Sequence, residues 1–199
     1  TDMNEVLGST AGNALEIAES VRFLRNEVRE SRLNNVTMSL CAEMLVVAGV
    51  EADRDRARER CDEAVTSGRA AEIFARMVEV LGGPHDFLER YESYLAVAPV
   101  THAVHTQGVV TKVDTRAVGN AIIELGGGRR QVGEELDLSV GFSDIAPIGT
   151  HLDADTPLAV IHAASETAAE RAQQRLLEAV TLGDLPPSER PVVFEILTG

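Results

Sequence analysis

The sequence is poor in aromatic and sulfur-containing residues, and it has no long apolar run. Its 199 residues include no tryptophan, two cysteines and 4% aromatic residues. Cys41 and Cys61 form no CxxC pair, so neither a disulfide scaffold nor a zinc ribbon is supported, and a reduced, buried thiol is expected at both positions. No stretch approaches the roughly 18 apolar residues of a membrane helix, and no basic segment leads into an apolar one at the N-terminus. These absences predict a cytoplasmic protein without a membrane span or a secretory signal.

Positive charge is also scarce. The chain has 18 Lys and Arg residues against 32 Asp and Glu residues, a net charge of −14 at pH 7. Binding to nucleic acid without sequence preference needs cations that displace phosphate counterions, and binding to an anionic membrane surface needs them too. We therefore expect neither a nucleic-acid partner nor a membrane partner. Hydrophobic residues at 44% and charged residues at 25% are typical of a folded globular protein.

The first 95 residues carry apolar positions at spacings of three and four, which predicts helices. Leu40, Met44 and Val47 form one such face, and Asn13 is the candidate N-cap of the first helix. Glycine follows each of the last three helical patterns and is expected to end them. The helices are expected over residues 14–24, 37–48, 53–66 and 70–81.

The pattern changes after residue 95 to short segments rich in Val, Thr and Ala, separated by turn residues. Strands are expected at residues 97–104, 108–113, 136–140, 146–149, 158–162 and 192–197, the first two joined by a tight connection. Two helices are expected among them, one capped by Asp114 or Thr115 and running to Leu125, the other over residues 167–180. The fold class is therefore α/β or α+β, with a helical part at residues 1–95 and a β-rich module with flanking helices at residues 96–199.

Five histidines suggest a metal site or acid–base chemistry, but their spacing does not favour either. His102 and His105 form an HxxH pair, which an alternating strand places on opposite faces, and no further zinc ligand stands nearby. His162 ends an apolar strand, where a structural role is expected, and His85 and His151 lie in loops without an identifiable partner. We expect no zinc site.

The run Gly126-Gly127-Gly128-Arg129-Arg130 allows two interpretations. Consecutive glycines can wrap an anion and two arginines can clamp phosphate. However, the glycines follow a helix rather than open one, unlike the usual strand–loop–helix phosphate site. A helix stop with outward-facing arginines is the favoured interpretation.

The turn at residues 7–12 precedes a helix that carries Glu16 and Glu19. A glycine-rich turn can direct backbone carbonyls toward one point, and carbonyls with a carboxylate are ligands for a hard or alkali cation. The simpler alternative, favoured on the residues alone, is that Glu19 is an exposed helix acid. No GxSxG, Walker or GxGxxG motif is present, so residue chemistry alone discloses no activity.

Several stretches together resemble the C-terminal portion of the pyrimidine-nucleoside phosphorylase family, and most closely its bacterial thymidine phosphorylases. The resemblance is collinear over essentially the whole chain. It is carried by residues 1–4 (TDMN), 11–16 (AGNALE), 36–45 (VTMSLCAEML), 114–117 (DTRA), 126–131 (GGGRRQ), 139–142 (SVGF) and 157–162 (PLAVIH).

This resemblance implies that the chain is a little under half of an enzyme with a small helical domain and a large α/β domain, and that it supplies the C-terminal part of the larger one. In the family, thymidine or a related nucleoside and phosphate meet in the cleft between the domains. The family's phosphate-binding and pyrimidine-binding residues lie upstream of anything present here, so no catalytic and no substrate-binding residue can be assigned. The isolated fragment is expected to be inactive, and the homodimer expected for the whole enzyme would form through the missing N-terminal part.

One family site does reach this chain. The family binds a potassium ion through two backbone carbonyls and a glutamate, which by position match Leu7, Thr10 and Glu19. The family also has a β-rich C-terminal module that resembles the barrel-sandwich of biotinyl and lipoyl carriers. Lys112 is the only lysine nearby, and it lies inside an expected strand rather than at a turn, so no covalent cofactor is expected. A non-catalytic carrier-like or protein-interaction module is the alternative to the enzyme.

Overall fold

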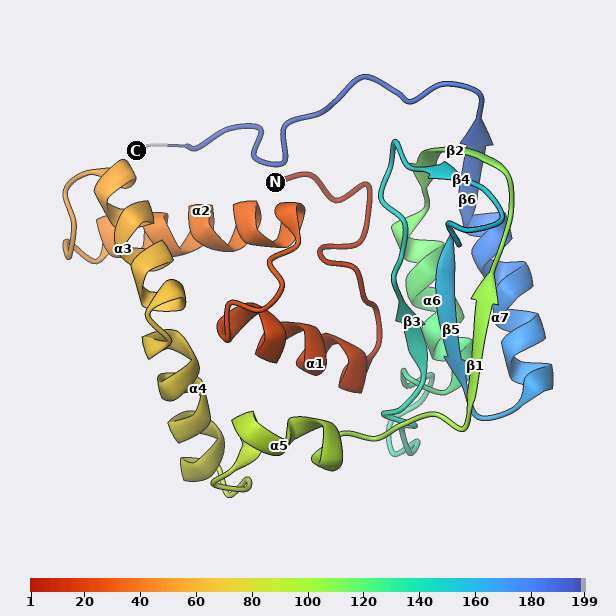
Figure 1. The fold of residues 1–199 in the computed structure, drawn as a ribbon, viewed down its shortest axis with the longest axis horizontal. Coiled ribbons are helices and arrows are strands. Elements are labelled where there is room, and N and C mark those ends of the chain that lie inside the picture. Colours follow the sequence, from red (N-terminus) through yellow and green to blue (C-terminus); the bar gives the residue numbers. More distant parts are fainter. Residues whose placement is uncertain (198–199) are drawn as a thin grey trace. The chain divides into compact units, whose positions relative to one another are not determined.

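A computed structural model describes residues 1–197 and shows mixed helical and strand structure (Figure 1). The elements of this part of the chain are α1 (Asn13–Leu24), α2 (Ser31–Val47), α3 (Arg54–Thr66), α4 (Arg69–Val80), α5 (Phe87–Tyr94), β1 (Val100–Val104), β2 (Gly108–Val113), α6 (Thr115–Leu125), β3 (Gly141–Ser143), β4 (His151–Leu152), β5 (Ala159–Ala163), α7 (Glu166–Ala179) and β6 (Val180–Gly183). The expected α+β class is confirmed. None of the described helices has the length and apolar character needed to cross a membrane.

The chain divides into two compact units. The first contains Thr1, residues 18–94 and the described residues after Arg190, and the second contains residues 2–17 and 95–190. The second unit is therefore assembled from two separate stretches of sequence. The domain boundary proposed at residue 96 stays a prediction.

The first unit is helical, and polar side chains cap the starts of its helices α2 and α3. The Glu30 carboxylate accepts a hydrogen bond from the Leu33 N–H at 2.7 Å, so α2 begins at Ser31, six residues before the expected start. Asp53 caps α3 in the same way through the N–H groups of residues 55 and 56. Between these helices, Phe23, Met38 and Val65 form a small buried cluster.

The apolar face expected for α2 is not the buried one. Leu40, Met44 and Val47 are 52%, 61% and 86% exposed, and the residues that α2 buries are Val36, Met38 and Ala42. The 3–4 spacing correctly predicted a helix but not which side packs. Sequence reasoning also missed the short helix α5.

The second unit contains two three-stranded antiparallel sheets (Figure 1). Their strand orders are β1–β5–β3 and β4–β2–β6. The strands expected at 97–104 and 108–113 are joined by a tight connection, as predicted, but β1 and β2 lie in different sheets. No closed barrel forms among the described residues, so the expected likeness to a barrel-sandwich is only a loose one. Helices α6 and α7 pack on each other, and α7 also packs on strands of both sheets.

Three expected strands are not strands in the structure, and the backbone groups of two of them are used elsewhere. Within residues 136–140, the Asp137 N–H donates to the Gly126 carbonyl and the Leu138 carbonyl accepts from Ala14. Within residues 146–149, the Ala146 N–H donates to the Leu158 carbonyl and the Gly149 N–H donates to the Val110 carbonyl, so the segment pairs with no single strand. Residues 192–197 have no strand pairing. The last described strand is instead β6, which follows α7 directly and pairs with β2.

Residues 2–17, which we call the N-terminal strap, are bound to the second unit by backbone hydrogen bonds. The N–H and carbonyl of Ala11 pair with those of Phe142 at 2.9 and 2.8 Å. Gly141 allows this approach: its φ is +152°, and a Cβ there would lie 2.3 Å from the Ala11 carbonyl oxygen. Ala11 thereby enters the core of the unit, whose largest fully buried side chains include Phe142, Leu152, Leu158, Ile161 and Leu176.

Candidate functional site

The turn that holds two of the proposed potassium ligands lies in the N-terminal strap. Thr10 is buried and Leu7 is half exposed. The Ser9 carbonyl accepts from the Ile145 N–H at 2.9 Å, and the Ala11 carbonyl accepts from Phe142. The turn is therefore held in place from both sides, and backbone carbonyls of the type that a hard cation uses are present on it.

The third proposed ligand, Glu19, lies on α1 and is partly buried. It belongs to the first unit, whereas Leu7 and Thr10 belong to the second. The potassium site therefore stays a prediction. Among residues 1–197 no group of three or more His, Cys, Asp or Glu side chains is placed to hold a metal ion.

The glycine–arginine run ends α6, as the favoured interpretation predicts. Gly126 is the C-cap with φ +104°, and its N–H and that of Gly127 donate to carbonyls of the last helical turn. In the loop that follows, the backbone N–H groups of Arg130 and Gln131 donate to the Glu134 carboxylate at 2.6 and 3.2 Å. These two hydrogen bonds lower the pKa of Glu134.

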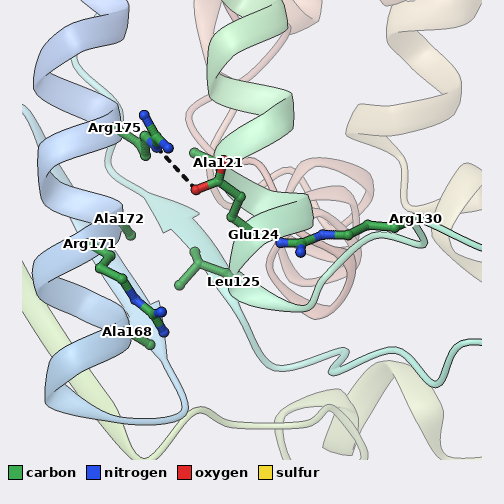
Figure 2. Close-up of a pocket in the computed structure, with 8 residues that line it drawn as sticks. All are labelled: Ala121, Glu124, Leu125, Arg130, Ala168, Arg171, Ala172 and Arg175. Atoms are coloured by element: carbon green, nitrogen blue, oxygen red, sulfur yellow. Dashed lines mark hydrogen bonds and ion pairs between the residues drawn. The ribbon is translucent and has the colours of Figure 1, made fainter.

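The loop also carries Arg130 to a pocket between α6 and α7 (Figure 2). Arg171 and Arg175 reach the same pocket from α7, and Glu124 reaches it from α6. The pocket has a volume of about 80 Å³ and opens to solvent. Four apolar side chains complete its lining: Ala121, Leu125, Ala168 and Ala172. We call it the arginine pocket.

Within residues 1–197, carboxylates hold only one of the three arginines. Arg175 Nε lies 3.1 Å from Glu124 Oε2, and its Nη1 lies 3.2 Å from Glu178 Oε2. These contacts raise the pKa of Arg175 above its ordinary value. The guanidinium groups of Arg130 and Arg171 form no hydrogen bond or ion pair with any described residue, although the Glu134 carboxylate is close enough to Arg130 for the two charges to interact.

The histidines take structural positions. His102 Nε2 lies 2.6 Å from the Gln173 Oε1 of α7, and His105 is exposed just after β1. His162 in β5 lies with its Nε2 2.9 Å from the Ser143 Oγ of the neighbouring strand β3. Burial lowers the pKa of His162. Ser143 in turn donates to the Asp144 carboxylate at 3.0 Å.

The two cysteines are free, as expected, and they are half-buried rather than buried. Burial raises the pKa of the Cys61 thiol, and the nearby Cys41 raises it further. The neutral thiol is therefore favoured at Cys61, which agrees with a structural role.

Sequence reasoning singled out Arg130 but missed Arg171 and Arg175. These two residues stand four apart on a helix that was predicted correctly, so they share one face. That spacing was visible in the sequence. The packing of α6 against α7, which brings Arg130 to that face, was not.

Residues 109–183 match the family model of the pyrimidine nucleoside phosphorylase C-terminal domain. The match runs from β2 to the end of β6, and so includes the whole arginine pocket. It covers well under half of the chain, and it supports the family resemblance for the C-terminal portion.

Proposed function

We propose that the protein takes part in the reversible phosphorolysis of thymidine, because residues 109–183 match the family model of the pyrimidine nucleoside phosphorylase C-terminal domain. The products are thymine and 2-deoxy-α-D-ribose 1-phosphate. The family match carries the proposal of a pentosyltransferase. The choice of thymidine rests on the closer resemblance of the sequence to bacterial thymidine phosphorylases.

The proposed reaction breaks the bond between the deoxyribose anomeric carbon and thymine N1, and forms a bond from that carbon to a phosphate oxygen. Thymine leaves with the electron pair and is protonated. Catalysis of such a step depends on holding phosphate against the anomeric carbon and on stabilising the departing base. We propose that this chain supplies part of the scaffold around that site rather than the groups that touch the substrates, because no family substrate ligand matches a position in its sequence.

The direct test is phosphate-dependent release of thymine from thymidine by the full-length product of the gene. Thymine should appear only when phosphate is present, and uridine offered in parallel measures the preference for thymidine. If uridine is cleaved as fast as thymidine, the protein is a pyrimidine nucleoside phosphorylase without a preference for thymidine. If neither thymine nor uracil is released, the proposal is wrong.

The 199-residue chain alone is expected to release no thymine under the same conditions. The chain is purified from a host without its own phosphorylases. Measurable phosphate-dependent release of thymine by this preparation would contradict the expectation.

We also propose that Leu7, Thr10 and Glu19 contribute to a potassium site, with the first two acting through their carbonyls. The chemistry of these groups suits a hard cation, and hydrogen bonds to Ile145 and Phe142 hold the turn that carries Leu7 and Thr10. In the full-length protein, Glu19→Gln should abolish the rise in melting temperature that potassium gives over an equal concentration of choline. Glu79→Gln, an exposed acid on α4, is the matched control and should keep that rise. A Glu19→Gln protein that responds to potassium like the control would exclude this glutamate as a ligand.

The remaining elements of the proposal rest on the resemblance alone. They are a homodimer of the full-length enzyme and a cytoplasmic location. A carrier function is not favoured by any observation, because Lys112 lies within β2, paired with Thr181, rather than at a hairpin tip where a carrier displays its modified lysine.

A further inference from the structure

The arginine pocket collects positive charge in a strongly acidic chain. Arg130, Arg171 and Arg175 are three of only 18 basic residues in a protein of net charge −14. They come from two places that are distant in sequence, the loop after α6 and the helix α7. Figure 2 shows the side chains of Arg130 and Arg171 extending from opposite sides toward the space beside Leu125.

The charges of this cluster are only partly balanced by the protein. Glu124 and Glu178 are both engaged with Arg175. Arg130 and Arg171 make no guanidinium hydrogen bond or ion pair among the described residues, which leaves their donor groups available to a ligand. A guanidinium presents five donors in a planar fork that matches two oxygens of one anion.

The shape of the pocket also selects among anions. Its apolar lining consists of three alanines and Leu125, so no bulky side chain fills the space between the arginines. Two available guanidinium groups match the two negative charges of a phosphate or phosphomonoester dianion and its several acceptor oxygens. A carboxylate would satisfy only one of them.

We propose that the arginine pocket binds a phosphate group, with Arg130 and Arg171 as its ligands and Arg175 as a third positive charge held in place by Glu124. The phosphate is either free inorganic phosphate or the phosphate of a small phosphomonoester. This proposal does not rest on the proposed catalysis, and its test uses neither thymidine nor phosphorolysis.

The experiment is a titration of the 199-residue chain, labelled with ¹⁵N, with inorganic phosphate, ribose 5-phosphate and ribose at constant ionic strength. Phosphate and ribose 5-phosphate should shift the amide resonances of α6, α7 and the loop between Gly126 and Asp137, whereas ribose should not. Tighter binding of ribose 5-phosphate than of phosphate identifies a phosphomonoester as the ligand, and equal binding identifies free phosphate. If neither anion shifts these resonances, the proposal is wrong.

Substitutions of single arginines distinguish specific phosphate binding in the pocket from non-specific electrostatic attraction of the anion. Arg171→Gln and Arg130→Gln should each weaken binding about tenfold, since each removes a charge-assisted hydrogen bond. Arg129→Gln removes the same charge from the same loop, but Arg129 does not line the pocket and its Nε donates to the Glu134 carbonyl. Equal weakening by Arg129→Gln and Arg171→Gln would show non-specific attraction and would overturn the proposal.

Glu124→Gln gives a test of opposite sign. It removes a negative charge that lines the pocket, so phosphate should bind several-fold more tightly to this variant. A purely structural role for the Glu124–Arg175 pair predicts a small loss of thermal stability with no gain in phosphate affinity. That second result would also count against the proposal.

Discussion

At the scale of single residues, the clearest chemical unit outside the arginine pocket is the chain His162–Ser143–Asp144. The Ser143 hydroxyl has one proton and donates it to Asp144, so it accepts from His162, whose Nε2 must then carry a hydrogen. The second ring nitrogen stays unprotonated as long as burial disfavours the charged ring. The residue types in the sequence predicted a structural histidine here, but the serine partner became visible only through the pairing of β3 with β5.

The first prediction concerns the titration of this histidine. Its folded-state pKa is lowered below the ordinary value of 6.5, so the unfolded chain binds more protons than the folded chain as the pH falls through that range. The contribution of His162 to stability is therefore present above about pH 6.5 and is lost as the pH falls through its folded-state pKa. An NMR titration of the ring should give a midpoint below 6.5.

The same prediction has a matched stability measurement. Between pH 7.5 and pH 5, His162→Gln should lose less of its free energy of unfolding than the parent protein does. His105→Gln, which changes an exposed histidine outside the strand, should keep the parental slope. An NMR midpoint for His162 above 6.5 would contradict the burial argument.

At the scale of elements, helices were predicted well and strands poorly, for a physical reason. The helices depend on local spacing and caps: α6 begins after Asp114, whose carboxylate accepts from the Ala117 N–H at 3.0 Å, and it ends at Gly126. Strands β3 and β4 have only 3 and 2 residues, and they exist through partners distant in sequence. The one helix cap that failed, Asn13, donates instead to the Gly127 carbonyl at 2.9 Å, a contact across the unit that no local pattern shows.

The second prediction tests the cap of α6. Asp114→Ala should lower the free energy of unfolding by about 1 kcal/mol, because the Ala117 N–H loses its acceptor at the helix start. Asp114→Asn keeps an acceptor and should lose much less. Gly119→Ala in the same helix, where an added Cβ meets no atom within 4 Å, should instead stabilise by about 0.5–1 kcal/mol. Urea unfolding measures all three, and a neutral Asp114→Ala would show that the cap contributes nothing.

At the scale of the whole molecule, the second unit depends on a segment that the sequence assigned to the helical part. The N-terminal strap contributes Ala11 to the core and hydrogen bonds to residues near 127, 138, 142 and 145. Nothing in the composition of residues 2–17 indicates this, because the partners lie far along the chain. The arginine pocket could be predicted only in part for the same reason: Arg130 was recognised, but its neighbours were set by the packing of α6 on α7.

The third prediction tests the strap through Gly141. Gly141→Ala adds a Cβ that would lie 2.3 Å from the Ala11 carbonyl oxygen, so the strap has to move away from β3. We expect a loss of about 3 kcal/mol or more, the sum of backbone strain and overpacking, and faster proteolysis within residues 2–12. Gly133→Ala also has a positive φ, of +91°, but an added Cβ there meets nothing within 4 Å. This control measures the cost of the positive φ alone, about 1–2 kcal/mol. Equal losses of unfolding free energy in the two variants would show that the close approach of the strap does not contribute to stability.

The pairing of Ala11 with Phe142 also has a consequence for the order in which the protein is made. The two residues are separated by about 130 positions, and ribosomes add about 5–20 residues per second. The strap is therefore translated roughly 7–25 seconds before its partner strand exists. Throughout that interval Val6 and Ala11 have no core to enter, although the helices of residues 18–94 are translated within it. Synthesis imposes a waiting period on the first segment of the chain that refolding from denaturant, where all residues are present at once, does not reproduce.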